Sequence, residues 1–331
     1  MAALLLFFVE AWLHTDNFLY RYRSVFAAGR TMDKVLYAER HCPGMLIIGN
    51  SRADNGFDPR TLGQHLDFSV PSGIFNLGLP GADARVLSGV VQRLDDAGCL
   101  TSGVRYAVIS LDEAIVQATD SLGQEVFFAS RRDMLTDARY LDAARATLRL
   151  WGYSANFRQM REPATAQRFF KASLGSVEPM GGGAALHLGY RAGTGALQDA
   201  DAALRQEAGS RLPPDANNVR HLYRMLDLLA ERAVRVAIVF PPLLNREVLY
   251  RTEPTPASAP YLSIAAELRR RQLPMLALQT GEPPRPAEFV NAGHLNDRGA
   301  KRHSILLAQE LNRTWGSYQV RLESAPRAGT P

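Results

Sequence analysis

Short apolar runs alternate with amphipathic stretches along much of the chain. The first run, Met45 to Ile48, leads directly into Gly49-Asn50-Ser51 and a polar turn. Apolar runs of this length, bounded by glycine, proline and polar residues, are typical of strands that are buried on both faces. Further strands are predicted within residues 73–81, 106–111, 234–240 and 274–279. Apolar positions at helical spacing predict helices within residues 14–41, 61–66, 82–97, 217–232, 261–271 and 300–315. This alternation predicts an α/β domain with a five-stranded parallel sheet.

The alternation is interrupted between about residues 113 and 215. This stretch holds helical patterns at 131–151 and 165–174 and glycine-rich parts at 181–183 and 189–195. Gly193-Thr-Gly195 lacks the third glycine and the preceding strand of a dinucleotide fingerprint, and no cofactor is expected. We interpret the stretch as an insertion in a domain of residues 42–323, lying over the active edge of the sheet as part lid and part partner surface. The polar residues 324–331 are expected to form a disordered tail.

The N-terminal stretch from Ala2 to Leu13 is apolar except for Glu10. At about a dozen residues it is shorter than the roughly 20 needed to span a bilayer, and it lacks the basic start and cleavage site of a signal peptide. Aromatic and basic residues such as Trp12 and Arg21 follow, as at a membrane interface. We therefore expect residues 1–41 to be a membrane-proximal helical segment. A buried or docking helix of a soluble protein is the alternative.

The composition is that of a globular protein with a sizeable core, because 46% of the 331 residues are hydrophobic and 21% are charged. The formal net charge is +5, and the Lys and Arg residues are scattered, with the densest runs at 131–132 and 269–271. Scattered positive charge is typical of a solvated surface, so no nucleic-acid partner is expected. Lipid headgroups and anionic polymers stay open as partners.

The two cysteines, Cys42 and Cys99, belong to no Cys-x-x-Cys or Cys/His cluster, and no metal site is predicted. Cys42 precedes the first predicted strand, and Cys99 precedes the strand at 106–111. If these strands are neighbours, both thiols lie at the amino edge of the sheet. A disulfide in an oxidising compartment and two free buried thiols both fit this placement.

Ser51 is the first candidate for chemistry, because it directly follows a buried strand. In open parallel sheets, ligands bind at the carboxyl ends of strands, where helix N-termini supply N–H groups and positive dipole ends. A serine at this place can act as a nucleophile, or it can simply cap the next helix. Residues near the other end of the chain favour the first alternative.

Three loops at the same end of the predicted sheet carry polar residues and glycines in a distinctive order. They are Gly-Asn-Ser-Arg-Ala-Asp-Asn-Gly at 49–56, Asn-Leu-Gly-Leu-Pro-Gly at 76–81 and Asn-Ala-Gly-His-Leu-Asn-Asp-Arg-Gly at 291–299. Their order and spacing resemble the SGNH or GDSL hydrolase superfamily, flavodoxin-like α/β proteins that cleave or transfer acyl groups on an activated serine. The resemblance covers residues 43–111 and 217–315. It implies a flavodoxin-like three-layer sandwich with a helical and irregular insertion.

The resemblance implies a role for each matching residue. Ser51 is expected to be the nucleophile and His294 the general base, while Asn291 sets the tautomer of the imidazole. The backbone N–H groups of Ser51 and Gly81 are expected to form the oxyanion hole.

Three positions depart from the pattern of the superfamily. Asn50 replaces the usual aspartate of the first block, and with Arg52 it is expected to contact a polar or anionic substrate. The third block normally supplies Gly-x-Asn-Asp, whereas this chain has Ser-Leu-Asp-Glu at 110–113. Asp112 therefore lies near the place of the missing oxyanion asparagine and is a further candidate for substrate binding. Asn291 replaces an aspartate, and an amide stabilises an imidazolium less than a carboxylate does.

The membrane-proximal segment and the His-Leu-Asn-x-x-Gly-Ala turn look most like the branch that modifies cell-surface polymers. This branch includes alginate O-acetyltransferase-like proteins and the protein that helps to D-alanylate lipoteichoic acid. The resemblance implies a periplasmic serine acyl esterase or acyltransferase, anchored to the inner membrane by its N-terminus. Acyl groups, with acetyl the expected one, on a cell-surface polysaccharide would be its substrate, and a membrane-bound O-acyltransferase its partner. The alternatives are a catalytically degenerate scaffold that binds glycan or such a partner, and a cytoplasmic esterase, which the N-terminus disfavours.

Overall fold

The structure is a computed structural model of the whole chain. It describes residues 1–22, 29–118, 127–175, 187–201, 212–244, 259–278 and 285–316. The predicted tail at 324–331 and the glycines at 181–183 lie outside the described residues.

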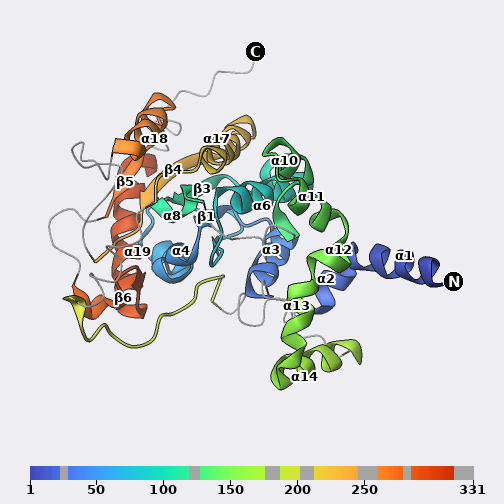
Figure 1. Cartoon of the computed structure of the whole chain (residues 1–331). Coiled ribbons are helices and arrows are strands. Elements are labelled where there is room, and N and C mark those ends of the chain that lie inside the picture. The colour runs from blue at the N-terminus through green and yellow to red at the C-terminus, as the bar shows by residue number, and fades with distance from the viewer. Residues whose placement is uncertain are drawn as a thin grey trace, which may run out of the picture.

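A five-stranded parallel sheet forms the centre of the domain (Figure 1). Its strands are β1 (Met45–Gly49), β2 (Ile74–Gly78), β3 (Tyr106–Ser110), β4 (Arg235–Phe240) and β5 (Met275–Ala277). They lie in the order β2-β1-β3-β4-β5. The order reverses beside β1, and in flavodoxin-like sheets ligands bind at the carboxyl end of the strand where this happens. The predicted α/β class, the five parallel strands and the flavodoxin-like architecture are confirmed.

The α-helices vary in length from one turn to more than four. In chain order they are α1 (Ala2–Leu13), α2 (Asp16–Tyr22), α3 (Gly29–His41), α4 (Ser51–Gly56), α5 (Pro59–His65), α6 (Ala84–Asp96), α7 (Cys99–Ser102), α8 (Glu113–Val116), α10 (Arg131–Thr136), α11 (Tyr140–Thr147), α12 (Arg149–Gly152), α13 (Ser154–Arg158), α14 (Pro163–Ser173), α17 (Ala216–Glu231), α18 (Ala259–Arg270) and α19 (Asp297–Leu311). A π-helical turn, Asn312–Gly316, extends α19.

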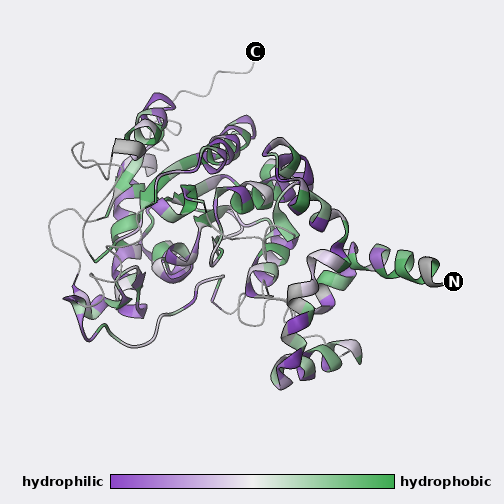
Figure 2. Ribbon diagram, in the orientation of Figure 1, coloured by the Kyte–Doolittle hydropathy of each residue, from purple (hydrophilic) through white to green (hydrophobic). Residues whose placement is uncertain are grey.

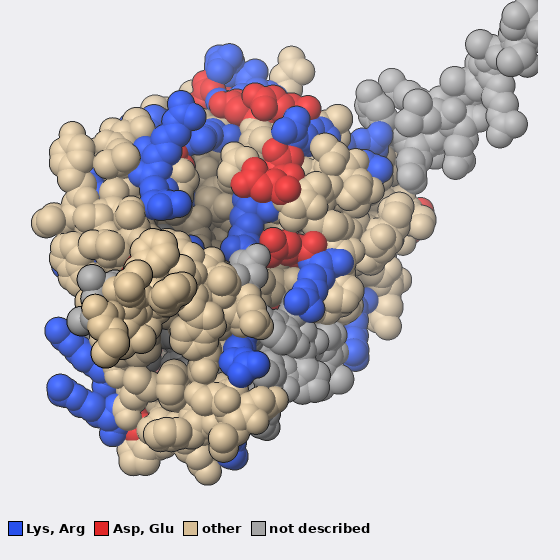
Figure 3. Space-filling model, turned by 90° about the vertical axis from the view of Figure 1, so that its right-hand side faces the viewer, with Lys and Arg blue, Asp and Glu red and all other residues tan. Residues whose placement is uncertain are grey.

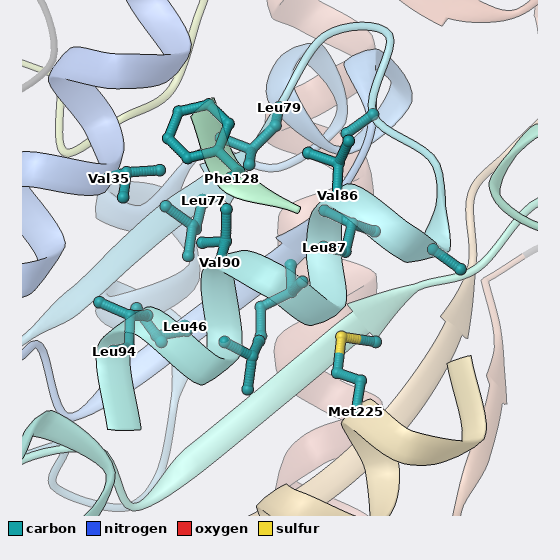
Figure 4. Close-up of a cluster of buried hydrophobic side chains, with 14 of the residues drawn as sticks. Val35, Leu46, Leu77, Leu79, Val86, Leu87, Val90, Leu94, Phe128 and Met225 are labelled. Atoms are coloured by element: carbon teal, nitrogen blue, oxygen red, sulfur yellow. The ribbon is translucent and has the colours of Figure 1, made fainter. Parts of the chain in front are cut away.

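Helices cover both faces of the sheet and complete three layers. On one face, α3, α6, α17 and α18 pack against strand residues that include Leu46 and Ile48. Figure 4 shows part of this cluster, with Leu46 of β1 close to Leu94 of α6. On the other face, α4, α5 and α19 pack against Met45 and Ile47. Alternate side chains of β1 thus enter opposite cores, which explains why the strand is apolar at every position.

Two elements near the candidate site differ from the prediction. The polar turn expected after β1 is the short helix α4. The expected loop at 289–299 begins with an antiparallel hairpin of β6 (Phe289–Asn291) and β7 (His294–Leu295). The helix α19 then begins at Asp297, before the predicted residue 300, because the side chain of Asn296 accepts a hydrogen bond from the N–H of Gly299 at 3.0 Å and caps the helix.

Most helices of the insertion lie beside the N-terminal helices and away from α4 (Figure 1). Helix α12 packs on α1, and α14 packs on α2. The carboxylate of Glu10 caps α12, accepting hydrogen bonds from the N–H groups of Arg149 at 2.5 Å and Leu150 at 3.1 Å. Residues 187–201 of the insertion reach the carboxyl ends of the strands, where the N–H of Arg191 donates to the carbonyl of Asp54 at 3.0 Å. This segment therefore lies beside α4, and its predicted role as a lid stays a prediction.

The first helix, α1, projects from the body of the protein and is largely apolar (Figures 1 and 2). Leu4, Leu5, Phe7 and Phe8 are each more than half exposed, at 63%, 65%, 67% and 66%. In contrast, α3 buries Val35 and other apolar side chains in the core of the domain. Among the described residues, we find no helix with the length and apolar character that crossing a bilayer requires.

Cys42 and Cys99 form a disulfide bond, with their Cα atoms 4.9 Å apart. The bond joins the end of α3 to α7, so of the two alternatives that the sequence left open, the structure contains the disulfide. It lies at the amino edge of the sheet, as expected, where the N–H of Arg105 donates to the carbonyl of Gly44 at 2.9 Å. Ser51 is at the opposite edge.

Candidate active site

Ser51 is the first residue of α4 and directly follows β1 and its cap, Asn50. The side-chain oxygen of Asn50 accepts a hydrogen bond from the N–H of Arg52 at 2.9 Å. Asn50 is therefore the helix cap, which was the alternative role considered for Ser51. The Ser51 hydroxyl is left to contact another group, and its N–H, in the first helical turn, needs no carbonyl partner within the helix.

Close backbone packing fixes α4 on the ends of β1 and β2. A Cβ atom at Gly78 would lie 2.3 Å from the backbone nitrogen of Asp54, so only glycine permits this approach. The buried side chain of Asn76 holds the same helix, donating from Nδ2 to the carbonyl of Ala53 at 2.8 Å. These contacts determine where the Ser51 side chain lies.

His294 reaches Ser51 from the β6–β7 hairpin. Its Nε2 lies 2.8 Å from the Ser51 Oγ, and its Nδ1 lies 2.9 Å from the Oδ1 of Asn291. An amide oxygen only accepts hydrogen bonds, so Nδ1 carries the proton and Nε2 is free to accept one. The same Oδ1 accepts a bond from the N–H of Gly293 at 3.1 Å, which fixes the orientation of the amide. The structure thus brings the three residues predicted to be catalytic into one hydrogen-bonded chain.

The surroundings of His294 favour the neutral imidazole. Burial lowers its pKa below the usual value of 6.5, and the positive charges of Arg52 and Arg191 lower it further. The carboxylate of Asp54 acts in the opposite direction. A neutral imidazole with a free Nε2 is the form that can accept the Ser51 proton.

Asn50 and Asp112 form a buried pair beside Ser51. The Nδ2 of Asn50 donates to both carboxylate oxygens of Asp112, at 3.0 and 2.9 Å. Asp112 also caps α8 through the N–H of Ile115 at 3.3 Å, and burial raises its pKa. Arg52 faces the same carboxylate at 3.5 Å and that of Glu113 at 3.2 Å. The side chains of Asn50, Arg52 and Asp112 all contact protein groups, and their predicted contact with substrate stays a prediction.

A second buried charge cluster, which was not predicted from the sequence, lies under α4. The Nζ of Lys34, on α3, lies 2.5 Å from the Oδ1 of Asp54 and 2.5 Å from the carbonyl oxygen of Gly78. Neither charged side chain is exposed to solvent. Arg30 adds a second cation, 3.2 Å from the same carboxylate oxygen. Burial lowers the pKa of Lys34 to about 8, against the opposing effect of Asp54. The cluster joins α3 to the helix that begins with Ser51 and to the end of β2.

Gly81, the other predicted oxyanion-hole residue, lies in the turn after β2. It is exposed and has a φ of 76°, a conformation that favours glycine. The turn is closed by a hydrogen bond from the N–H of Ala82 to the carbonyl of Leu79 at 3.0 Å. This places Gly81 at the same edge of the sheet as Ser51, and its donation to an oxyanion stays a prediction.

Side chains suited to a metal are not grouped at the site. Within the described ranges, no cluster of three or more His, Cys, Asp or Glu residues could hold a metal ion. In the described residues, the hydroxyl of a serine contacts a neutral histidine, and the histidine contacts an amide. This arrangement can activate the hydroxyl as a nucleophile. No protein-family model and no curated protein matches the chain.

Proposed function

We propose that the protein is a serine-dependent acyl esterase or acyltransferase that acts on acyl groups, with acetyl the expected one, of a cell-surface polysaccharide. The observation that carries the proposal is the 2.8 Å contact between Ser51 Oγ and His294 Nε2, with Asn291 on the far side of the imidazole. The position at the carboxyl end of β1, where flavodoxin-like sheets bind ligands, supports it.

The chemistry follows from the protonation states. His294 takes the proton of the Ser51 hydroxyl through Nε2 as Oγ attacks the ester carbonyl carbon. The N–H groups of Ser51 and Gly81 stabilise the negative oxygen that develops. The imidazolium then protonates the leaving alcohol, and the acyl group remains on Ser51. Water or an acceptor hydroxyl, deprotonated by the same imidazole, attacks the acyl-serine and regenerates the free hydroxyl.

The direct test is covalent labelling of the full-length protein with a fluorophosphonate, together with hydrolysis of p-nitrophenyl acetate. Ser51→Ala should abolish labelling and hydrolysis, while Ser102→Ala, which changes an exposed serine of α7, should leave both intact. A folded wild-type protein that neither reacts nor hydrolyses the ester would contradict the esterase proposal.

The second candidate function is a scaffold that binds glycan or a membrane-bound O-acyltransferase without catalysis. Two observations favour it. An amide stands where a carboxylate would stabilise imidazolium, and the buried carboxylate of Asp112 lies close to the expected oxyanion site. Glycan binding that survives Ser51→Ala, in a protein that no fluorophosphonate labels, would favour the scaffold.

We further propose that the protein is attached to the periplasmic face of a membrane. The exposed apolar side chains of α1 support it, because water solvates such a helix poorly. Figure 3 views the side from which α1 projects: wide areas carry neither acidic nor basic side chains, and Lys and Arg lie around them.

The chain should therefore sediment with vesicles that contain phosphatidylglycerol. Replacing Phe7 and Phe8 by serine should abolish sedimentation, whereas Phe170→Ser, an exposed aromatic of α14, should not. Equal binding by all three proteins would contradict attachment through α1.

A further inference from the structure

Residues 187–201, which we call the strap, join the helix of the nucleophile to the hairpin of the histidine. On the side of α4, the N–H of Arg191 donates to the carbonyl of Asp54 at 3.0 Å, and the Nδ2 of Asn55 donates to the carbonyl of Arg191 at 2.8 Å. On the side of the hairpin, the N–H of Leu197 donates to the carbonyl of Phe289 at 2.7 Å, and the N–H of Asp297, at the start of α19, donates to the carbonyl of Gly193 at 3.0 Å. Arg191 therefore lies on the short link between the two parts of the candidate site.

Close contacts on both sides of Arg191 fix the course of the strap. A Cβ atom at Gly189 would lie 2.1 Å from the carbonyl oxygen of Asn76, and one at Gly193 would lie 2.5 Å from that of Leu295. Such approaches require glycine, so the backbone of the strap is seated against β2 on one side and β7 on the other. The base of the Arg191 side chain is thus held in place by the fold.

Arg191 also differs from the other cations around the site in the contacts of its charged group. Arg30 and Lys34 both contact the carboxylate of Asp54, and Arg52 faces the carboxylates at the start of α8. The guanidinium of Arg191 is exposed and forms no hydrogen bond or ion pair with any part of the chain that the structure describes. Its positive charge nevertheless lowers the pKa of His294, since the guanidinium is near enough to disfavour the imidazolium.

We infer that Arg191 binds a negatively charged group of the substrate and gives the site a preference for acyl esters of anionic compounds. The inference rests on the proposed acyl chemistry and names its substrate class: an O-acylated molecule that carries a carboxylate near the ester. A guanidinium matches the two oxygens of a carboxylate in a planar, bidentate contact. A solvent-exposed arginine usually has only water around it. This one lies on the strap between α4 and the β6–β7 hairpin, where a bound anion would pair with its positive charge.

The test compares two acetyl esters, 4-acetoxybenzoate and its methyl ester, which lacks the negative charge, with each kcat/KM divided by the rate constant of the same ester with hydroxide. The wild-type protein should hydrolyse the anionic ester with the higher kcat/KM. Arg191→Gln should reduce this preference by roughly tenfold, Arg191→Glu should reverse it, and Arg191→Lys should retain part of it. Arg131→Gln removes an exposed arginine of α10, away from the strap, and should leave the preference unchanged. An unaltered preference in Arg191→Gln would overturn the inference.

A binding measurement separates this inference from the proposed function. The products 4-hydroxybenzoate and methyl 4-hydroxybenzoate can be titrated while the His294 ring is observed by NMR. The anionic product should shift the His294 resonances at lower concentration than its methyl ester, and Arg191→Gln should remove the difference. If the wild-type protein hydrolyses neither ester but shows this difference, the esterase proposal fails and the anion site stands. If hydrolysis occurs but both products bind equally to the wild-type protein, the esterase proposal stands and the anion site is wrong.

Discussion

The Oδ1 of Asn291 lies 2.9 Å from the Nδ1 of His294, in the place where a serine hydrolase would have a carboxylate. The amide holds the correct tautomer but carries no charge to stabilise the imidazolium that would form during the proposed acyl transfer. We therefore expect Asn291→Asp to raise kcat/KM for ester hydrolysis by at least roughly tenfold. Asn291→Ala, which removes the oxygen, should lower it. A lower rate in Asn291→Asp, measured with p-nitrophenyl acetate, would show that the amide is required as it stands.

The pH dependence of hydrolysis should report the lowered pKa of His294. The neutral imidazole is the form that can accept the Ser51 proton, and burial with two nearby arginines lowers its pKa below 6.5. The rate should therefore stay constant at neutral pH and fall only when the pH drops through a value below 6.5. In Asn291→Asp, the added negative charge should move this acidic limb to higher pH. A wild-type limb above 6.5 in the plot of kcat/KM against pH would contradict the structure.

The buried ion pair of Lys34 and Asp54 should contribute strongly to stability. Lys34→Met keeps the volume of the side chain but leaves the carboxylate with Arg30 as its remaining cation. Removing one partner of a buried pair costs roughly 3–5 kcal/mol in the free energy of unfolding, measured with urea. Lys171→Met, an exposed lysine of α14, should change it little. Equal stabilities for the two variants would argue against a buried charge on Lys34.

The same lysine should give the protein a distinct dependence of stability on alkaline pH. Its pKa is about 8 in the folded state, against the ordinary lysine value of 10.5. Between these values the unfolded chain binds more protons, so this group makes the free energy of unfolding rise with pH. The wild-type curve should rise relative to that of Lys34→Met between about pH 8 and 10.5. Parallel curves, from urea unfolding at several pH values, would contradict the assignment.

Gly78→Ala should displace the helix that carries Ser51. The added Cβ would meet the backbone nitrogen of Asp54 at 2.3 Å, and a shift of about 1 Å at a reacting group can cost roughly a hundredfold in rate. Gly63→Ala is the matched control, because its Cβ meets only the Cδ1 of Ile74, at 3.5 Å, within α5. It should retain activity and be at least as stable as the wild-type protein. Full activity in Gly78→Ala would show that the position of α4 is not critical.

The sheet could be predicted from the sequence because its strands are buried on both faces and therefore apolar throughout. Ser51 and His294 could be paired because the glycine and asparagine patterns that flank both resemble those of the SGNH superfamily. The helix α4 could not be foreseen, since Ser-Arg-Ala-Asp-Asn-Gly has no apolar periodicity and is held by backbone contacts. The hairpin at 289–295 is likewise too short to show a strand pattern.

The buried charges were missed for a different reason. A lysine on an amphipathic helix is normally solvated, so burial of Lys34 is not expected from its charge. A signal was present, because Lys34 shares a helical stripe with Thr31, Val35 and Ala38, all buried. Its partner Asp54 gives no such signal, and the pairing of two charges far apart in sequence depends on the tertiary fold. The role of Arg191 also depends on the fold, because it lies in an insertion with no periodic pattern.

Two interactions hold the helix α3 on the domain. One is the disulfide bond between Cys42, at its end, and Cys99, and the other is the ion pair between Lys34 and Asp54. A fragment trimmed to begin at the first strand would therefore not keep the candidate site intact. It would expose apolar surface on α6 and leave an uncompensated carboxylate beneath the nucleophile. The smallest piece that preserves the geometry around Ser51 has to include α3, whatever truncation is chosen upstream of it.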